Sequence, residues 1–459
     1  MKKNLLNWDD TIVAIATPIG IGAIGVIRIS GKNAFSIVQK LVVKNLFSCK
    51  SHTLHYCTLK YHNETLDDVV LSLFKNPQSY TGEDVIEISC HGSVFIQEKI
   101  IHVLIALGAR LAVAGEFTQR AFINKKLDLI QAESVADLIA SETQLAQQAA
   151  MNNLKGYLST ELKTMRETLI QFSALIELEL DFSQEDVEFA DRTAFYTLIK
   201  KIQYHLSLLI HSFAFGNAIK NGVKVAIIGK PNAGKSTLLN TLLQENRAIV
   251  SAIPGTTRDT IEATINIQHI LFRLIDTAGI RTQSTDEIEL LGIHKSVETI
   301  NQAAMILFIY DYTTTNLQDF KNWINNFNIQ NKKIIIIANK IDDTTQPFFE
   351  KQLNDIPIVY ISAKNNIGIN ELKNAMVDKI IAEKVKSENT IITNTRHVSL
   401  LQQINTTITE IEQALQQQLS GDLISIHIRE ALYLLGSLTG EITNEDTLDY
   451  IFSKFCIGK

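Results

Sequence analysis

Cysteine is scarce in this sequence of 459 residues, which contains only four. No two of them have the CxxC spacing of a redox or metal motif, and a disulfide framework is not expected from so few. The four are Cys49, Cys57, Cys90 and Cys456.

Long hydrophobic runs are also missing. The longest apolar stretches, such as residues 303–310 and 334–338, are far shorter than the ~20 residues that a membrane helix needs. Asp9 and Asp10 interrupt any signal-like apolar segment after the basic residues at the N-terminus. We therefore expect a cytoplasmic protein with no membrane partner.

An excess of positive charge is absent as well, since the formal net charge is −6. Proteins that coat nucleic acid without specificity are usually strongly basic, so the net charge argues against a general RNA binder. A local basic pocket for one structured RNA stays possible. The 46% hydrophobic content is ample for a buried core, and the length favours about three domains of roughly 150 residues each.

Residues 1–120 mix short apolar runs with glycine-containing turns, which is typical of an α+β domain. We expect strands over 10–16, 24–29, 68–74 and 85–89, and a helix over 94–107. A cluster of His and Cys in residues 52–62 raises the alternative of a zinc site. Its spacing fits no common zinc finger, and we expect a strand there.

Glycine nearly disappears in residues 121–221, where apolar residues recur at three- and four-residue steps, as in long amphipathic helices. Strand–loop–helix alternation follows, and helical periodicity then resumes. This order indicates that one domain is inserted in another, which is tolerated where the inserted domain's termini lie close together. We predict a multidomain fold with four segments: an α+β N-terminal domain (1–120), an all-α helical domain in two parts (121–221 and 381–459), and an inserted α/β P-loop domain of the Ras-like GTPase type (222–380).

A phosphate-binding loop is the strongest motif. The apolar strand of residues 223–228 leads into it, and a helical stretch follows. Backbone N–H groups of such a loop converge on the phosphates of a nucleotide, and the helix presents its positive end. Lys235 would reach the outer phosphates and the Ser236 hydroxyl would bind Mg²⁺. The loop and its continuation supply the nucleotide contacts Asn232, Ala233, Gly234, Lys235, Ser236 and Thr237.

Three further elements follow in the order expected of a GTPase. Thr257 is a candidate second Mg²⁺ ligand, and Asp276, at the end of a strand, would hold the ion through water. Asp342 in the Asn339-Lys340-Ile341-Asp342 motif offers the two acceptors that guanine's adjacent donors require. The remaining predicted GTP contacts are Ser251, Ile253, Gly255, Thr256, Thr277, Ala278, Gly279, Ser362, Ala363 and Lys364.

One position departs from Ras-type enzymes. A glutamine that orients the attacking water follows the glycine of the third element in those enzymes, but here that position is Ile280. Hydrolysis must find help elsewhere. Asn232 and the oxygen-rich stretch 251–257 could hold a monovalent cation that stabilises the developing charge.

The sequence resembles the MnmE (TrmE) family of bacterial tRNA-modification GTPases over its whole length. The likeness includes Asp10-Thr11-Ile12-Val13-Ala14, Tyr80-Thr81-Gly82-Glu83-Asp84-Val85, Gly115-Glu116-Phe117-Thr118, Lys126-Leu127-Asp128-Leu129 and the tail Cys456-Ile457-Gly458-Lys459. That tail is the most specific mark, because generic GTPases do not end this way.

The resemblance implies a folate-binding and dimerising N-terminal domain that takes a 5-formyl or 5,10-methylene tetrahydrofolate. It places Arg28, Glu87, Lys126 and Lys459 at the folate. It implies a K⁺ site formed by Asn232, Ser251, Ile253 and Thr256, and catalytic roles for Glu289 and Cys456.

The resemblance also implies a function. Family members form homodimers, work with a flavoprotein partner, MnmG, and add a (carboxymethyl)aminomethyl group to C5 of the wobble uridine (position 34) of certain tRNAs. GTP hydrolysis drives motions that gate this reaction. The alternative is a regulatory or ribosome-assembly GTPase without modification chemistry, which the nucleotide motifs alone do not exclude. Without the resemblance, Arg28 could merely pair with a carboxylate, and Cys456 could be an inert thiol.

Overall fold

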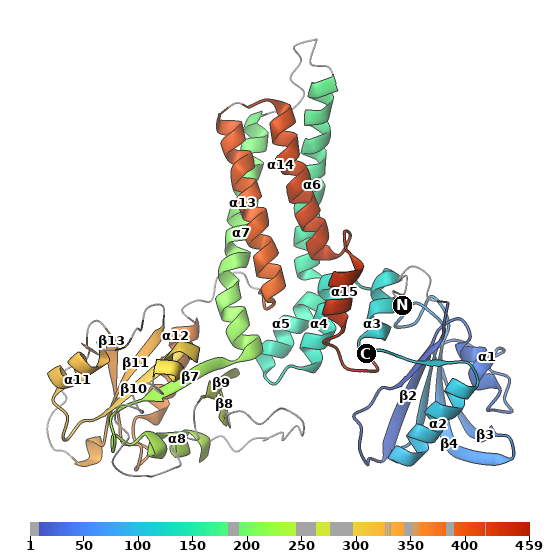
Figure 1. The fold of residues 1–459 in the computed structure, drawn as a ribbon, viewed down its shortest axis with the longest axis horizontal. Coiled ribbons are helices and arrows are strands. Elements are labelled where there is room, and N and C mark those ends of the chain that lie inside the picture. The colour runs from blue at the N-terminus through green and yellow to red at the C-terminus, as the bar shows by residue number, and fades with distance from the viewer. Residues whose placement is uncertain are drawn as a thin grey trace. The chain divides into compact units, whose positions relative to one another are not determined.

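The structure is a computed structural model that describes residues 9–181, 192–244, 263–275, 297–325, 327, 329, 332–343, 352–353, 356–381, 390–417 and 419–459. The chain divides into two compact units (Figure 1). Unit 1 comprises residues 1–140, 150–202 and 403–459, and unit 2 comprises residues 141–149 and 203–402.

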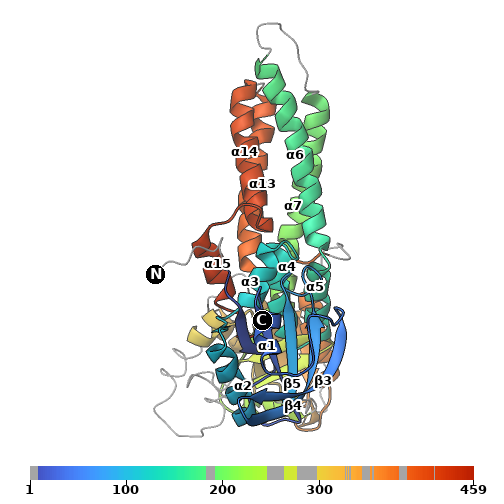
Figure 2. The ribbon, with the colours of Figure 1, turned by 90° about the vertical axis from the view of Figure 1, so that its right-hand side faces the viewer.

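Unit 1 begins with a six-stranded sheet of order β3-β4-β5-β2-β1-β6. All neighbouring strands are antiparallel except β1 and β6, which are parallel. Two helices, α1 and α2, pack against this sheet (Figure 2). The elements are β1 (Ile12–Ile15), β2 (Ile24–Ser30), α1 (Ala34–Gln39), β3 (Thr53–Tyr61), β4 (Glu64–Phe74), β5 (Val85–His91), α2 (Val94–Ala106) and β6 (Arg110–Leu111).

The alternation of side chains along the strands sets the two faces of this sheet. Ile27 and Ile29 of β2 and Ile88 of β5 are fully buried in a core that also contains apolar residues of α1 and α2. Arg28 and Glu87 therefore project from the other face, and they lie directly opposite each other on β2 and β5. The sheet thus presents a charged pair on the face away from α1 and α2.

The helices of unit 1 follow this sheet. Phe172 of α6 stacks on Phe195 of α7 with ring centroids 4.1 Å apart, and the Phe195 side chain is buried. Figures 1 and 2 show the bundle of long helices to which α6 and α7 belong. Asp128 and Gln131 form a reciprocal capping box at the start of α4, which fixes where that helix begins. The helices are α3 (Glu116–Ile123), α4 (Leu129–Ile139), α5 (Gln144–Leu154), α6 (Tyr157–Asp181), α7 (Arg192–Asn221), α13 (Thr395–Gln416), α14 (Gly421–Thr439) and α15 (Glu445–Phe452). The boundary between the units falls within α5, α7 and α13.

Unit 2 contains a seven-stranded sheet of order β12-β13-β11-β10-β7-β9-β8. The central strands are parallel, and only β8 and β12 at the edges pair antiparallel. Its elements are β7 (Val223–Ile228), α8 (Lys235–Gln244), β8 (Ala263–Ile267), β9 (Ile270–Leu274), β10 (Met305–Asp311), α11 (Leu317–Ile324), β11 (Lys333–Asn339), η1 (Ile341–Asp343), β12 (Gln352–Leu353), β13 (Ile356–Ile361) and α12 (Ile369–Ile381).

Helices cover both faces of the unit 2 sheet. Leu239 of α8 and Leu372 of α12 belong to the core on one face, and Phe320 of α11 belongs to the core on the other. The central strands are buried on both sides, which explains why β10 and β11 read as continuous apolar runs. This is the doubly wound α/β fold of Ras-like P-loop proteins, with one extra edge strand, β12.

The predicted strands and helices are confirmed within a few residues, including β3 at the His and Cys cluster. The multidomain class, with an α+β part, long helices and an inserted P-loop α/β part, is confirmed too. The three boundaries between the four predicted segments stay predictions, and the one at residue 120 falls inside α3. In the part of the chain that the structure describes, no helix is long and apolar enough to cross a membrane.

Candidate functional site

The phosphate loop joins the end of β7 to the start of α8. The Lys235 ammonium donates hydrogen bonds to the carbonyl oxygens of Gly229 and Lys230, at 2.7 and 2.9 Å. Burial lowers the pKa of Lys235, because removing the ammonium from water disfavours its charged form. A phosphate at this place would supply the negative charge that compensates for that desolvation.

Asn339 ties the loop to the base-reading motifs. Its side chain is 3% exposed, its Nδ2 donates to the Ala233 carbonyl at 2.8 Å, and its Oδ1 accepts from the Ala363 N–H at 3.0 Å. The Thr241 hydroxyl of α8 donates to the Ala363 carbonyl at 2.7 Å. Three segments far apart in sequence, which lie at or after the ends of β7, β11 and β13, are therefore held together at the carboxyl ends of parallel strands of one sheet.

The two charged residues of the Asn-Lys-x-Asp motif have partners in this state. Lys340 donates to Asp311 at 2.6 Å, and the exposed Asp342 accepts from the Asn365 side chain at 3.0 Å. Burial alone would raise the pKa of Asp311, but hydrogen bonds from Lys340 and Thr313 outweigh it and lower the pKa below 3.8. Asp342 is therefore placed at the edge of the site, where its carboxylate already accepts an amide donor.

A cavity of about 450 Å³ lies beside the phosphate loop, within the size range of small-molecule sites. Asn232 lines it and is exposed, with a backbone φ of 65° that asparagine tolerates better than most residues. The other lining residues are Lys230, Pro231, Ala233, Tyr310, Asp311, Thr314, Thr315, Asn316 and Asp319.

Part of the predicted nucleotide site lies outside the described residues. Among the predicted Mg²⁺ and K⁺ ligands, Ser236 and Asn232 are described. The predicted residues that fall outside are Ser251, Ile253, Gly255, Thr256, Thr257, Asp276, Thr277, Ala278, Gly279 and Glu289, together with Ile280.

A second site centres on Arg28. Its guanidinium forms an ion pair with Glu87 at 2.8 Å, and it lies 5.4 and 5.6 Å from the ring centres of Tyr80 and Phe117. Its NH1 donates to the carbonyl oxygen of Gly458 at 3.3 Å, across 430 residues of sequence. Pairing with a carboxylate, the simpler expectation for Arg28, is thus present, but the same side chain also holds the C-terminal tail.

The other predicted folate residues lie around this pair. Lys126 donates to the Pro77 carbonyl at 3.1 Å and lines a cavity of about 440 Å³ together with Tyr80, which also faces Arg28. Lys459 is half-buried and its N–H donates to the Cys456 carbonyl at 3.4 Å. Cys456 is exposed, unlike Cys57 and Cys90, whose pKa values are raised by burial.

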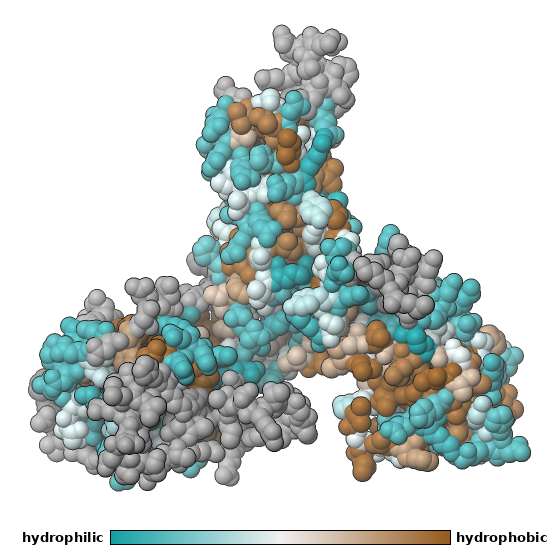
Figure 3. Space-filling view, in the orientation of Figure 1, coloured by the Kyte–Doolittle hydropathy of each residue, from teal (hydrophilic) through white to brown (hydrophobic). Residues whose placement is uncertain are grey.

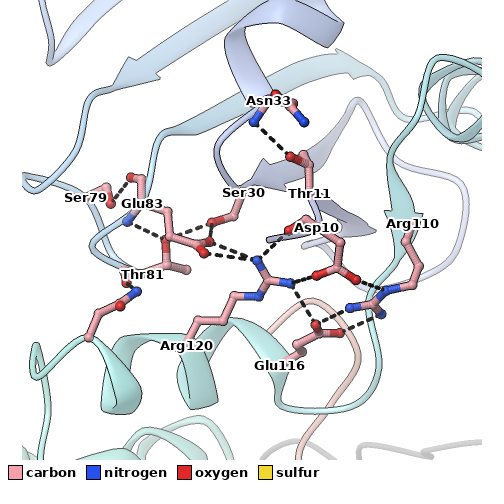
Figure 4. Close-up of polar contacts among 11 residues, drawn as sticks. Asp10, Thr11, Ser30, Asn33, Ser79, Thr81, Glu83, Arg110, Glu116 and Arg120 are labelled. Carbon is pink, nitrogen blue, oxygen red and sulfur yellow. Dashed lines mark hydrogen bonds and ion pairs between the residues drawn. The ribbon is translucent and has the colours of Figure 1, made fainter. Parts of the chain in front are cut away.

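A network of charged side chains lies in the same domain (Figure 4). Arg120, 2% exposed, pairs with Asp10, Glu83 and Glu116, and Arg110 pairs with Asp10 and Glu116. Burial would raise the pKa values of Asp10 and Glu116, but the two arginines outweigh it and lower both. The network joins β6, the start of α3 and the loop that carries Tyr80.

Sequence reasoning missed three residues that organise these sites. Asp311 holds Lys340, and its position at the end of an apolar strand was an available signal. Arg120 gave no signal of its own, because its partners Asp10 and Glu83 come from distant parts of the chain. Gly115 belongs to a motif of the resemblance that carried no role, and its N–H donates to the distant Cys456 carbonyl at 3.3 Å. A further group, Glu410, His427 and Glu430, brings three possible metal-ligating atoms within 4.8 Å of one another, and we assign it no role.

The fold and the loop after β7 define the class: a Ras-like P-loop nucleotide-binding domain inserted into a larger chain. Family models for the MnmE helical domain and for the GTP-binding protein TrmE N-terminus match residues 129–456 and 11–126. A protein of Cytophaga hutchinsonii named tRNA modification GTPase MnmE is 47% identical over 99% of this chain and 98% of its own length. One of the same name from Flavobacterium psychrophilum is 49% identical over 98% of this chain and 100% of its own. The chain belongs to the MnmE family of tRNA modification GTPases.

Proposed function

We propose that this chain hydrolyses GTP in the cytoplasm and, together with a flavoprotein partner, adds a (carboxymethyl)aminomethyl group to C5 of the wobble uridine of certain tRNAs. The observation that carries the proposal is the position of the C-terminal tail: the Gly458 carbonyl accepts a hydrogen bond from Arg28, which also pairs with Glu87. A GTPase that acts only as a switch has no need of a cysteine-bearing tail fixed on a second domain. This favours modification chemistry over the regulatory alternative.

The nucleotide site supports GTP as the substrate. Lys235 would neutralise the outer phosphates, and Asp342 would accept hydrogen bonds from guanine after releasing Asn365. Ser236 stands at the first turn of α8, where its hydroxyl suits a Mg²⁺ ion, and Thr257 would be the second ligand. The ion supplies charge stabilisation when bound.

Hydrolysis without a Ras-type glutamine needs another charge beside the phosphates. Asn232 is exposed in the phosphate loop and is suited to a monovalent cation such as K⁺. Ser251, Ile253 and Thr256 would complete its oxygen ligands. Glu289 would orient the attacking water.

The Arg28 site has the donors and acceptors that a tetrahydrofolate requires. Glu87 can accept from the pterin ring's N–H groups, and Arg28, Lys126 and Lys459 supply cations for the folate carboxylates. Tyr80 offers an aromatic face, and the cavity beside Lys126 has about 440 Å³. The folate would supply the one-carbon unit of the new group.

The exposed apolar side chains of the N-terminal sheet support a homodimer. Leu54 and Tyr56 of β3 are 70% and 72% exposed, and Ile24 of β2 is 67% exposed. Figure 3 shows apolar side chains gathered on this domain. Contiguous exposed apolar areas of this kind mark interfaces, and a second copy of the chain is the partner we propose.

The test is complementation in a bacterium that lacks its own MnmE-family protein. Cells that carry this chain should contain the C5-modified uridine at position 34, measured by mass spectrometry of tRNA nucleosides. Cells that carry Lys235→Ala should not. Folate binding by the purified chain, lost in Glu87→Gln, gives a second reading. Absence of the modified nucleoside in cells with a stable, GTP-hydrolysing chain would favour the regulatory alternative.

A further inference from the structure

The last residues of the chain lie on the N-terminal domain within unit 1. Phe452 and Phe455 are buried against Leu129 and Ala132 of α4, which anchors the segment just before the tail. Beyond this anchor the backbone makes two hydrogen bonds to distant residues: the Gly115 N–H donates to the Cys456 carbonyl at 3.3 Å, and Arg28 donates to the Gly458 carbonyl. The exposed thiol of Cys456 therefore extends from a fixed backbone.

Gly115 can occupy its place only without a side chain. Its φ is 69°, in the left-handed region that favours glycine. A Cβ atom there would lie 2.7 Å from the Phe452 carbonyl oxygen and 3.0 Å from the Cβ of Phe455. The clash would fall on the backbone at the end of α15, where no rotamer change can relieve it.

A similar restriction applies at the other end of the tail. Gly458 has a φ of 95°, and a Cβ on it would collide with the carbonyl oxygen of Ile15 at the end of β1. The tail is thus held at both ends by glycines that allow close backbone contact. These two close backbone contacts lie on either side of Cys456. Together they fix the position of its thiol more closely than the packing of Phe452 and Phe455 alone would.

The charge network extends this argument to the position of Gly115 itself. Gly115 is the residue before α3, and the first residue of that helix, Glu116, is 0% exposed and paired with both Arg110 and Arg120. The Val113 N–H also donates to Glu116 at 2.9 Å. The ion pairs of the buried Glu116 therefore hold the loop that contacts the tail.

We propose that Gly115 is a positioning residue: its side-chain-free, left-handed backbone seats the C-terminal tail and so places Cys456 beside the Arg28 site. The assignment of a chemical consequence rests on the proposed function. The contact between Gly115 and the tail does not rest on the proposed function, because it is set by the packing of the backbone before α3 against residues 452–456.

Gly115→Ala tests the seat, and Gly108→Ala is a matched control. Gly108 lies in the same domain with a φ of 111°, but a Cβ on it would meet nothing within 4 Å. Both variants therefore carry left-handed strain, and only one collides with the tail. Phe455→Ala disturbs the same seat from the tail side without backbone strain.

Amide exchange of the peptide 453–459 in the full chain is the first reading. We expect it to be roughly tenfold faster or more in Gly115→Ala and Phe455→Ala, and unchanged in Gly108→Ala. We expect wobble-uridine modification to fall in parallel, with GTP hydrolysis within about twofold of the unsubstituted chain.

Equal rates of amide exchange in residues 453–459 of the Gly115→Ala and Gly108→Ala variants would contradict the proposal that Gly115 holds the tail. Faster tail exchange with full modification would overturn the positioning role. If the unsubstituted chain modified no tRNA, the proposed function would fail, and the exchange measurement would still decide the seat.

Discussion

The nucleotide site and the Arg28 site are built in opposite ways. The phosphate loop is one continuous stretch between β7 and α8, and its partners lie at the ends of neighbouring strands of one sheet. The Arg28 site combines a strand of the first sheet with a tail carbonyl 430 residues later. The first is specified locally, and the second exists only after the two ends of the chain have come together.

Because one site is formed locally and the other by distant segments, the two sites depend on different parts of the molecule. The nucleotide site needs the fold of unit 2, where backbone amides and Asn339 hold the loop. The Arg28 site needs the ion pairs around Glu116 and the contact between Gly115 and the C-terminal tail, both within unit 1. Substitutions should therefore damage one site and spare the other, and the following predictions test that separation.

Arg120→Met should have the largest effect. The substitution removes the buried cation that Asp10, Glu83 and Glu116 share, and Arg110 still pairs with Asp10 and Glu116. Removing one partner of a buried ion pair typically costs about 3–5 kcal/mol, and the remaining arginine keeps the loss at the lower end of that range. Amide exchange of peptides from β2 and β5 should report this loss. The control Arg429→Met removes an exposed pair with Glu177 and should cost at most about 1 kcal/mol. Loss of nucleotide affinity in Arg120→Met, with the sheet intact, would break the separation.

Asp342→Asn should damage the nucleotide site alone. Loss of a charged hydrogen bond to guanine costs about 1.5–3 kcal/mol, and the new amide can donate to the second carbonyl of xanthine. GTP binding should weaken and xanthosine triphosphate binding should improve, as measured by calorimetry. Asp378→Asn, at an exposed position of α12, is the control. Unchanged GTP affinity in Asp342→Asn would contradict the assignment of the base-reading motif.

Potassium should accelerate hydrolysis over sodium at equal ionic strength, by roughly tenfold or more. Asn232→Ala should remove most of this difference. Asn232→Gly should do the same while accepting the φ of 65°, so that backbone strain is not the cause. Asn240→Ala, on the exposed side of α8, should retain the potassium response. Equal rates in both salts for the unsubstituted chain would refute the cation site.

Acid should weaken unit 1 through the same network, as the smallest effect. Asp10 and Glu116 have pKa values below their ordinary 3.8 and 4.5, so they stabilise the folded state above those values. That contribution is lost as the pH falls through the lowered pKa values. Exchange protection of β2 and β5 should decline below about pH 4. A decline that is already complete at pH 5 would point to other groups.

The comparison also explains how much could be predicted. The apolar strand predicted over residues 223–228 is β7, and the apolar stretches 303–310 and 334–338 largely coincide with β10 and β11, because strands buried on both faces need such runs. The phosphate loop followed from its flanks. The roles of Lys235 and Asp342 are properties of short motifs, which a sequence displays directly.

Long-range partners could not be predicted in the same way. Nothing in the sequence near Arg28 indicates Gly458, and nothing near Gly115 indicates Cys456. Arg120 reads as a helical surface residue, yet it is buried among three carboxylates from three segments. Such contacts depend on tertiary packing, and only the family resemblance pointed to the tail at all.

We propose that the C-terminal tail serves tRNA modification while unit 2 hydrolyses GTP. Cys456→Ser tests it most directly, because it changes one exposed atom of the tail. Cells that carry only this variant should lack the modified wobble uridine in tRNA nucleoside analysis, and the purified variant should bind and hydrolyse GTP like the unsubstituted chain. Wild-type levels of the modified nucleoside would contradict a chemical role for the thiol and reduce the tail to positioning by Lys459.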